Sequence, residues 1–340
     1  MGRTWTIPRG AAFTLVILIA FSFSRESARA IVDAFSQTNI AAPPDGAPWA
    51  NVAGVNTESG VYLGGGWVLT AAHVGVGNAN LSGTIYTYDG ISHRLTNTDG
   101  TATDLLLFHL STLPPLPSVP LATGTPTASS PVDMIGFGAI AGSDQTNIGT
   151  YTGFYWSTSP YKSWGSNKVR SGGTSSVNVG FGNLTVFKTD FSAPGTTGSG
   201  SPTSDEAQAA SGDSGGGVFH LNGSSWQLVG ILDAISTQPA QTPGTAVYGN
   251  TTASADIATY RNQIVGLMNS EIAPRLSIAL TGKSISVCWP DDGFSYQLQS
   301  AASLTASNWT TLNPSLISTN GELCVQLPAT NALRFFRLMK

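Results

Sequence analysis

The sequence predicts an all-β protein, built mainly from short strands joined by tight turns. Only 10% of the 340 residues are charged, whereas 39 are glycine, and this balance suits strands and turns better than long charged helices. Short runs of alternating apolar residues also follow one another at close spacing, separated by Gly, Pro, Asn and Asp. Such a pattern is typical of a β-barrel or a β-sandwich.

The first predicted element is a secretory signal peptide over residues 1–30. Arg3 and Arg9 precede the apolar run "AAFTLVILIAFSF", and "SARA" ends the segment at Ala30. A basic start, a short apolar stretch and a small-residue exit are the features of an export signal, with an uncleaved anchor as the alternative. Its removal changes the formal charge from −4 to −7, because the segment carries four arginines and one glutamate.

Residues 31–272 are predicted to form the main domain. An extended arm leads into two strands around a glycine turn, and a long loop and a helix come later in the domain. The predicted strands are "GVYLGGGWVLTAAHV", "GTIYTYDG", "DLLLFHL", "PVDMIGFG", "VNVGFG", "LTVFKTDF" and "WQLVGILDAI". The segment "SAPGTTGSGSPTSDEAQ" has little to bury, so we expect a long mobile loop. One helix is expected from Ser254 to Ile272, where apolar residues recur at helical spacing and serve packing.

Residues 273–340 are predicted to form a small, independent β-rich module. Pro274 ends the helix and starts the linker, and alternating segments such as "RLSIALTGKSISVCWP" follow. Cys288 and Cys324, the two cysteines of the chain, both lie here. An exported protein meets an oxidising compartment, so a disulfide is favoured, with two free buried thiols as the alternative.

Charge and composition exclude several classes of partner. The acidic chain has no basic patch for nucleic acid, and no membrane span is expected once the signal is removed. No cluster of His, Cys and Asp has the spacing of metal ligands. We therefore expect no cofactor and no metal centre, although a Ca²⁺ site on a loop stays open.

The stretch "ASGDSGGGVF" surrounds Ser214 with glycines, so the serine is either a loop residue or a nucleophile. A nucleophilic serine needs a general base within hydrogen-bond reach and a third group that orients the base. His73, one of four histidines, follows an apolar strand in "VLTAAHV", and Asp104 opens the apolar strand "DLLLFHL". A half-buried carboxylate in that place needs a hydrogen-bond donor. These three residues are the candidates for such a site.

The motifs "TAAHV", "DLLLFHL" and "GDSGGG", in this order, resemble the trypsin-like serine proteases of the chymotrypsin fold. The resemblance covers about residues 31–269, and "DMIGFG", "QLVGIL" and "PGTAVYGN" support it. It implies two β-barrels, with the cleft between them and a terminal helix. It also implies that Ser214 is the nucleophile, His73 the general base and Asp104 the group that orients His73. The N–H groups of Gly212 and Ser214 would bind the oxyanion.

The resemblance implies further roles. In this family a newly formed N-terminal amine pairs with the acid before the serine, and signal cleavage after Ala30 would expose Ile31 to pair with Asp213. Gln208, six residues before the nucleophile, would form a neutral floor of the specificity pocket, which argues against trypsin-type specificity. Asp233 stands where the family often has a small residue, and it is a second candidate for this pocket.

The sequence therefore predicts a secreted serine endopeptidase that acts on protein or peptide substrates. The C-terminal module resembles a β-rich tail of exported bacterial proteins, which implies attachment, sorting or partner contact, with a stabilising cap as the alternative. A lipase is disfavoured, because its catalytic histidine would have to follow the serine in the chain. A subtilisin-like protease is disfavoured, because its catalytic acid would have to precede His73. The remaining alternative is an inactive protease homologue that acts by binding.

Overall fold

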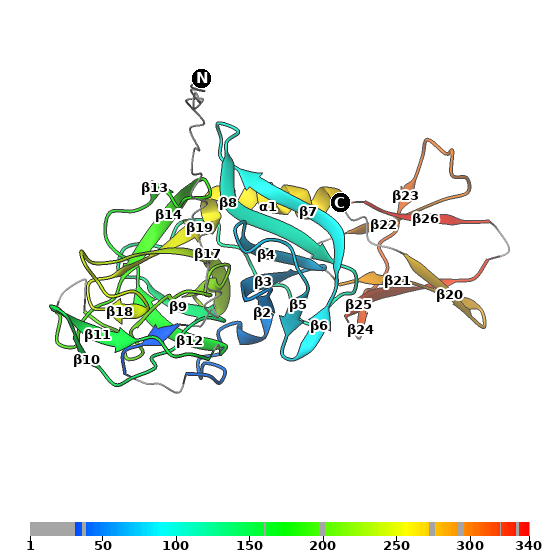
Figure 1. Cartoon of the computed structure of the whole chain (residues 1–340). Helices are drawn as coiled ribbons and strands as arrows, with labels where there is room; N and C mark the ends of the chain where they lie inside the picture. Colours follow the sequence, from blue (N-terminus) through cyan, green and yellow to red (C-terminus); the bar gives the residue numbers. More distant parts are fainter. Residues whose placement is uncertain are drawn as a thin grey trace, which may run out of the picture.

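The computed structural model describes residues 31–35, 39–159, 161–197, 201–271, 276–291, 296–319, 321–330 and 333–339. The expected signal peptide at 1–30, Pro274 and residues 198–200 of the expected mobile loop lie outside this part of the chain. Figure 1 shows two large β-structures side by side, followed by a smaller β-module at the C-terminal end. Among the described residues, no helix is long and apolar enough to cross a membrane.

The first barrel is a seven-stranded antiparallel sheet with the strand order β6-β5-β2-β3-β4-β8-β7. Its strands are β2 (Val52–Val55), β3 (Glu58–Gly64), β4 (Trp67–Ala71), β5 (Ala79–Leu81), β6 (Thr84–Tyr86), β7 (Tyr88–Thr96) and β8 (Ala102–Leu110). β4 and β8 are almost entirely buried, which matches their nearly continuous apolar sequences. They pair with Leu69 opposite Leu107, so the ends that carry the site candidates are held by the centre of this sheet.

The second barrel is also a seven-stranded antiparallel sheet, in the order β12-β9-β16-β17-β19-β14-β13. Its strands are β9 (Pro131–Gly136), β12 (Ser163–Lys168), β13 (Ser175–Asn178), β14 (Asn183–Asp190), β16 (Gly217–Asn222), β17 (Ser225–Ser236) and β19 (Thr251–Asp256). Beside it lie β1 (Val32–Asp33) paired with β15 (Ala207–Gln208), and the sheet of β10 (Thr146–Ile148), β11 (Tyr151–Tyr155) and β18 (Thr245–Val247). A 3₁₀ turn spans Trp49–Asn51.

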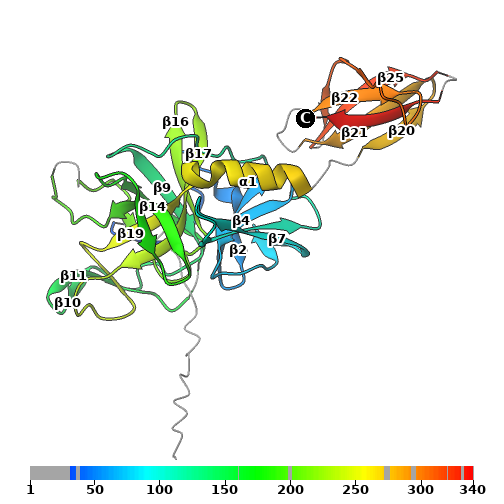
Figure 2. The same cartoon turned by 90° about the horizontal axis from the view of Figure 1, so that it is seen from above.

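The two barrels share one hydrophobic core, whose buried side chains include Val61 and Leu69 from the first barrel and Ile231 from the second. The helix α1 (Ile257–Glu271) lies against both, as Figure 2 shows. Its Tyr260 hydroxyl donates to Asn97 Oδ1 of the first barrel at 3.0 Å and accepts from the N–H of Thr185 in the second at 2.8 Å. Tyr260 therefore links the two barrels through these two hydrogen bonds.

The helix begins three residues later than the sequence pattern predicts. Ser254 and Ala255 belong to β19, where they pair with β14 and β17. The Oδ2 atom of Asp256 accepts hydrogen bonds from the N–H of Thr259 at 3.1 Å and from its hydroxyl at 2.7 Å. A side chain that satisfies the free N–H groups of the first turn marks the start of a helix, so α1 begins directly after Asp256.

The C-terminal module contains two small sheets. One has the order β20-β21-β25-β24 and the other β23-β22-β26. The strands are β20 (Ser277–Thr281), β21 (Ser284–Pro290), β22 (Gln297–Ala301), β23 (Thr310–Thr311), β24 (Ile317–Thr319), β25 (Glu322–Pro328) and β26 (Phe335–Met339). Trp289 and Val325 of the first sheet pack with Leu298 of the second. Cys288 and Cys324 lie opposite each other on β21 and β25 and form the expected disulfide.

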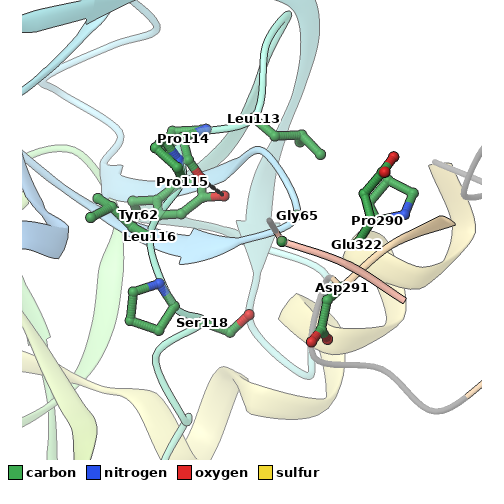
Figure 3. Close-up of a pocket in the computed structure, with 12 residues that line it drawn as sticks. Tyr62, Gly65, Leu113, Pro114, Pro115, Leu116, Ser118, Pro290, Asp291 and Glu322 are labelled. Carbon is green, nitrogen blue, oxygen red and sulfur yellow. Dashed lines mark hydrogen bonds between the residues drawn. The ribbon is translucent and has the colours of Figure 1, made fainter. Parts of the chain in front are cut away.

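A cavity of about 780 Å³ lies where the module approaches the first barrel. The proline-rich segment 113–117 and Tyr62 line one side, and Pro290, Asp291 and Glu322 line the other, as Figure 3 shows. This cavity is separate from the residues that the sequence singles out for chemistry.

Candidate active site

His73 follows the buried strand β4, and Asp104 lies in β8, the neighbouring strand of the first barrel. His73 Nδ1 is 2.6 Å from Asp104 Oδ2, and the backbone N–H of His73 donates to Asp104 Oδ1 at 2.9 Å. Asp104 is fully buried. One carboxylate oxygen binds the ring and the other binds the backbone of the same residue, so the carboxylate is fixed relative to the imidazole. The sequence candidates His73 and Asp104 are therefore brought together.

Burial alone would lower the pKa of His73, but the hydrogen bond and the charge of Asp104, together with Glu58 and Asp233, raise it above its usual value of 6.5. The aromatic ring of Phe181 stacks on the imidazole, with the ring centroids 4.8 Å apart and the planes inclined by 23°. Phe181 belongs to the loop between β13 and β14 of the second barrel. His73 thus has one edge fixed and one face covered.

Ser214 lies in the turn before β16, and its Oγ atom is 3.5 Å from the carbonyl oxygen of Asp233. The N–H of Gly215 donates to Leu232 O at 2.8 Å, and the N–H of Gly216 donates to Asp213 O at 2.8 Å. Gly215 has φ +83°, and a Cβ atom there would lie 2.1 Å from Ser59 O. Only glycine fits, because the turn is left-handed and pressed against the first barrel.

Two polar residues of the first barrel hold this turn. The N–H of Ser59 donates to Ser214 O at 3.0 Å, and its hydroxyl donates to Gly212 O at 3.2 Å. The hydroxyl of Thr70 donates to Ser59 O at 2.6 Å. Neither residue was predicted from the sequence, although a lone threonine in the apolar strand before His73 is a recognisable signal.

The backbone around Ser214 leaves hydrogen-bond donors free. Within the described residues, the N–H groups of Gly212 and Ser214 have no hydrogen-bond acceptor. Gly212 has φ +95°, a conformation that favours glycine. Free N–H groups beside a serine hydroxyl are the donors that an oxyanion requires.

The His73 Nε2 atom faces Glu58 and makes no hydrogen bond to Ser214 within the described part of the chain. Glu58 Oε2 is 3.7 Å from Nε2. Burial raises the pKa of Glu58, while the charge of His73 and the Ser214 hydroxyl act in the opposite direction. Glu58 was not predicted from the sequence, since it opens a strand and has no motif around it. In unliganded sites the base and the nucleophile are often apart until substrate binds.

Asp233 lies on β17 and is nine-tenths buried. One ligating atom from each of Asp233, Asp104 and His73 falls within 4.8 Å of the others. Burial, and then the charge of Asp104, raise the pKa of Asp233 to about 7. These atoms could geometrically hold a cation, but the short bond to Asp104 already occupies Nδ1 of His73, so we assign none. The second group that could geometrically hold a cation is Cys288, Glu322 and Cys324. Its two cysteines already form the disulfide.

A cavity of about 180 Å³ lies next to Ser214. It is lined by residues of the second barrel and its loops: Trp156, Ala209, Ala210, Ser211, Asp213, Ser214, Leu232, Asp233, Ala234 and Ile235. Gln208 does not line it; its side chain is buried, and its amide atoms have no hydrogen-bond partner in the described structure. The two specificity candidates therefore differ, since Asp233 lines the cavity and Gln208 does not.

Asp213 is fully buried beneath the same cavity. Its Oδ2 accepts from the N–H of Ala210 at 2.7 Å, but Oδ1 has no partner within the described residues. Burial raises the pKa of Asp213 well above its usual value. Ile31 is also buried, and its carbonyl oxygen accepts a hydrogen bond from Ser163, which lies opposite Gly136 in the sheet. A Cβ atom at Gly136 would lie 2.2 Å from Asp213 Oδ1, so this strand pair passes close to the carboxylate.

The two antiparallel barrels with a terminal helix, and a His–Asp pair facing a serine turn across them, define a trypsin-like domain. The family model described as Trypsin matches residues 39–257, so the chain belongs to the trypsin family. The predictions of an all-β two-barrel fold and of this family are confirmed.

Three solved structures illustrate the structural likeness. Rv3671c from Mycobacterium tuberculosis H37Rv, in an inactive mutant form, is 14% identical over 68% of this chain and 98% of its own, with a TM-score of 0.42. The NS6 protease of murine norovirus 1 is 17% identical over 64% and 94%, with a TM-score of 0.37. Human heparin binding protein is 15% identical over 68% and 96%, with a TM-score of 0.42. No match was found among curated proteins.

Proposed function

We propose that this chain is an exported serine endopeptidase in which Ser214, His73 and Asp104 act as the catalytic triad. The observation that carries the proposal is the 2.6 Å bond from His73 Nδ1 to the fully buried Asp104, on the barrel that faces the Ser214 turn. A buried carboxylate in this place selects the tautomer that leaves Nε2 free to take a proton.

In the proposed reaction, Ser214 Oγ attacks the carbonyl carbon of a peptide while His73 Nε2 takes the hydroxyl proton. The N–H groups of Gly212 and Ser214 hold the negatively charged oxygen of the tetrahedral intermediate. The C–N bond then breaks, and His73 gives its proton to the leaving amine. A water molecule hydrolyses the acyl-enzyme by the same steps and restores the serine. The residues present need no cofactor for this chemistry.

The activation and specificity residues extend the proposal. Removal of a signal peptide at 1–30 would give Ile31 a free amine, and this amine is the cation that the unpartnered oxygen of Asp213 needs. The cavity of about 180 Å³ would take the side chain before the cleaved bond. Its lining by Ala209, Ala210 and Ser211 favours a small or medium-sized side chain.

Secretion is part of the same proposal. The disulfide between Cys288 and Cys324 supports an oxidising compartment, because such bonds persist outside the cytosol. We assign protease activity to residues 31–272. The module at 273–340 is assigned to attachment or partner contact, with stabilisation as the second possibility.

The alternative is an inactive homologue that works by binding, and one observation favours it: His73 Nε2 contacts Glu58 rather than Ser214. The experiment is to treat residues 31–340, with a free Ile31 terminus, with a fluorophosphonate and to locate the adduct by mass spectrometry. Labelling at Ser214 that is lost in both Ser214→Ala and His73→Ala supports the protease. A folded chain without labelling makes the binding homologue the better account.

A further inference from the structure

Glu58 is a carboxylate in the candidate active site that, among the described residues, forms no ion pair with a lysine or an arginine. It opens β3 of the first barrel and is only partly exposed, with 26% of its side-chain surface accessible. Among the described residues, its one ion-pair contact is His73 Nε2, at 3.7 Å. Its Oε2 atom is shielded from solvent and lacks a well-formed hydrogen bond. A buried carboxylate oxygen in this state calls for a cation.

The position of Glu58 assigns it to one side of the cleaved bond. In the proposed reaction, His73 Nε2 must come within hydrogen-bond distance of the leaving nitrogen. A group that lies 3.7 Å from Nε2 therefore borders the part of the substrate that leaves. The cavity for the preceding side chain is lined by the second barrel and its loops, whereas Glu58 belongs to the first. The two features thus face opposite sides of the bond.

The charges around His73 favour a basic substrate residue at this position. Three carboxyl groups surround the imidazole: Asp104 at Nδ1, Glu58 at Nε2, and Asp233 next to Asp104. The fourth neighbour, Phe181, is apolar and covers the ring face. An ammonium or guanidinium group beside Glu58 would be stabilised by the negative potential of these carboxylates, and an acidic side chain would be repelled.

Glu58 also affects the resting arrangement, because its carboxylate lies 3.7 Å from His73 Nε2. This contact competes with the Ser214–His73 hydrogen bond that the proposed reaction needs. A cation from the substrate that pairs with Glu58 would release the imidazole.

We propose that Glu58 is a specificity-determining residue that binds a lysine or arginine side chain directly after the cleaved bond. This inference rests on the proposed function, since it presupposes that His73 and Ser214 carry out peptide hydrolysis. It names the substrate class: polypeptides cut before a basic residue. The pairing frees the imidazole of His73 for Ser214, so the preference is expected in kcat as well as in KM.

The test uses the chain from Ile31 to Lys340 and quenched fluorescent peptides built on one sequence that it cuts. The residue after the cut is Lys, Arg, Gln or Glu. We expect kcat/KM to be about tenfold or more higher for Lys than for Gln, since a charge pair at this distance in a partly shielded site exceeds a tenfold effect. Glu58→Gln should bring the ratio near one, and Glu58→Lys should prefer Glu. The exposed Glu322→Gln is the matched control and should keep the wild-type ratio.

An equal ratio in the wild type and in Glu58→Gln would overturn the inference. Fluorophosphonate labelling of Ser214, measured on the same samples, distinguishes failure of the proposed specificity from failure of the proposed protease function. If Ser214 is labelled and no preference for Lys exists, the specificity of Glu58 is wrong and the protease function stands. If Ser214 is not labelled in the folded wild type, the protease function is wrong, and the inference fails with it.

Discussion

A chain that begins at Ile31 should be more stable at neutral pH than a chain that carries one further residue before it. Asp213 is fully buried with Oδ1 unpaired, so without a cation its carboxyl group must stay protonated. Its pKa is raised well above 3.8 by burial. A group whose pKa is raised on folding favours the folded state at low pH, and this contribution is lost as the pH rises.

The magnitude follows from this linkage. In the extended chain, each pH unit above the usual carboxyl pKa costs about 1.4 kcal/mol of unfolding free energy, as long as Asp213 is protonated when folded and ionised when unfolded. In the chain that begins at Ile31, the amine pairs with the ionised carboxylate and removes this cost. Breaking a buried pair typically costs about 3–5 kcal/mol, so at pH 7 we expect a difference of about 3 kcal/mol between the two forms.

The assay is urea denaturation from pH 5 to pH 8 of three forms, released from cleavable fusions: one beginning at Ile31, one beginning at Ala30, and one with an acetylated Ile31. The first should be the most stable, and its advantage should grow from pH 5 to pH 7. Asp213→Asn should abolish the differences. If all forms unfold with free energies within about 1 kcal/mol of one another at every pH, Asp213 has no ionic partner at the N-terminus.

Three further predictions concern single sites. Asp104→Asn should keep the fold but slow fluorophosphonate labelling of Ser214 by about 10³–10⁴-fold, because His73 loses the partner that sets its tautomer; unchanged labelling would contradict the triad. Reduction of Cys288–Cys324, which closes a loop of 36 residues, should destabilise the module by about 4 kcal/mol in urea denaturation, and an unchanged module transition would contradict this. Asp233→Asn should gain about 1.4 kcal/mol of stability per pH unit relative to the wild type between pH 4 and pH 7, because the raised pKa of about 7 makes the wild type lose stability as the pH rises; parallel curves would refute that.

The sequence was sufficient to predict those parts of the site that lie within short motifs. Strand patterns next to His73 and Asp104 predicted the two strands β4 and β8, and the glycines around Ser214 predicted a tight turn. The disulfide was predicted from the shared module of its cysteines. These features depend on residues close together in the chain or on one family pattern.

Other features depend on contacts between distant segments, which a single sequence does not encode. Glu58 lies beside His73 and the serine turn only because β3 packs against the turn before β16, where the N–H of Ser59 donates to Ser214 O. Phe181 covers His73 from a loop that begins more than 100 residues later in the chain. The helix start was misplaced for a related reason, since Ser254 continues a strand through pairing with Phe187 and Leu232.

The loop that carries Phe181 is also fastened to the opposite barrel. Arg94 projects from β7, donates to Thr103 O at 2.7 Å, and hydrogen-bonds the carbonyl oxygen of Phe181. The aromatic ring over His73 is therefore coupled mechanically to the first barrel, although its loop belongs to the second. Because His73 also belongs to the first barrel, this tether keeps the ring over the imidazole when the angle between the barrels changes, and the loop between β13 and β14 must bend instead. A fluorine label on Phe181 would show by NMR whether the ring keeps this position.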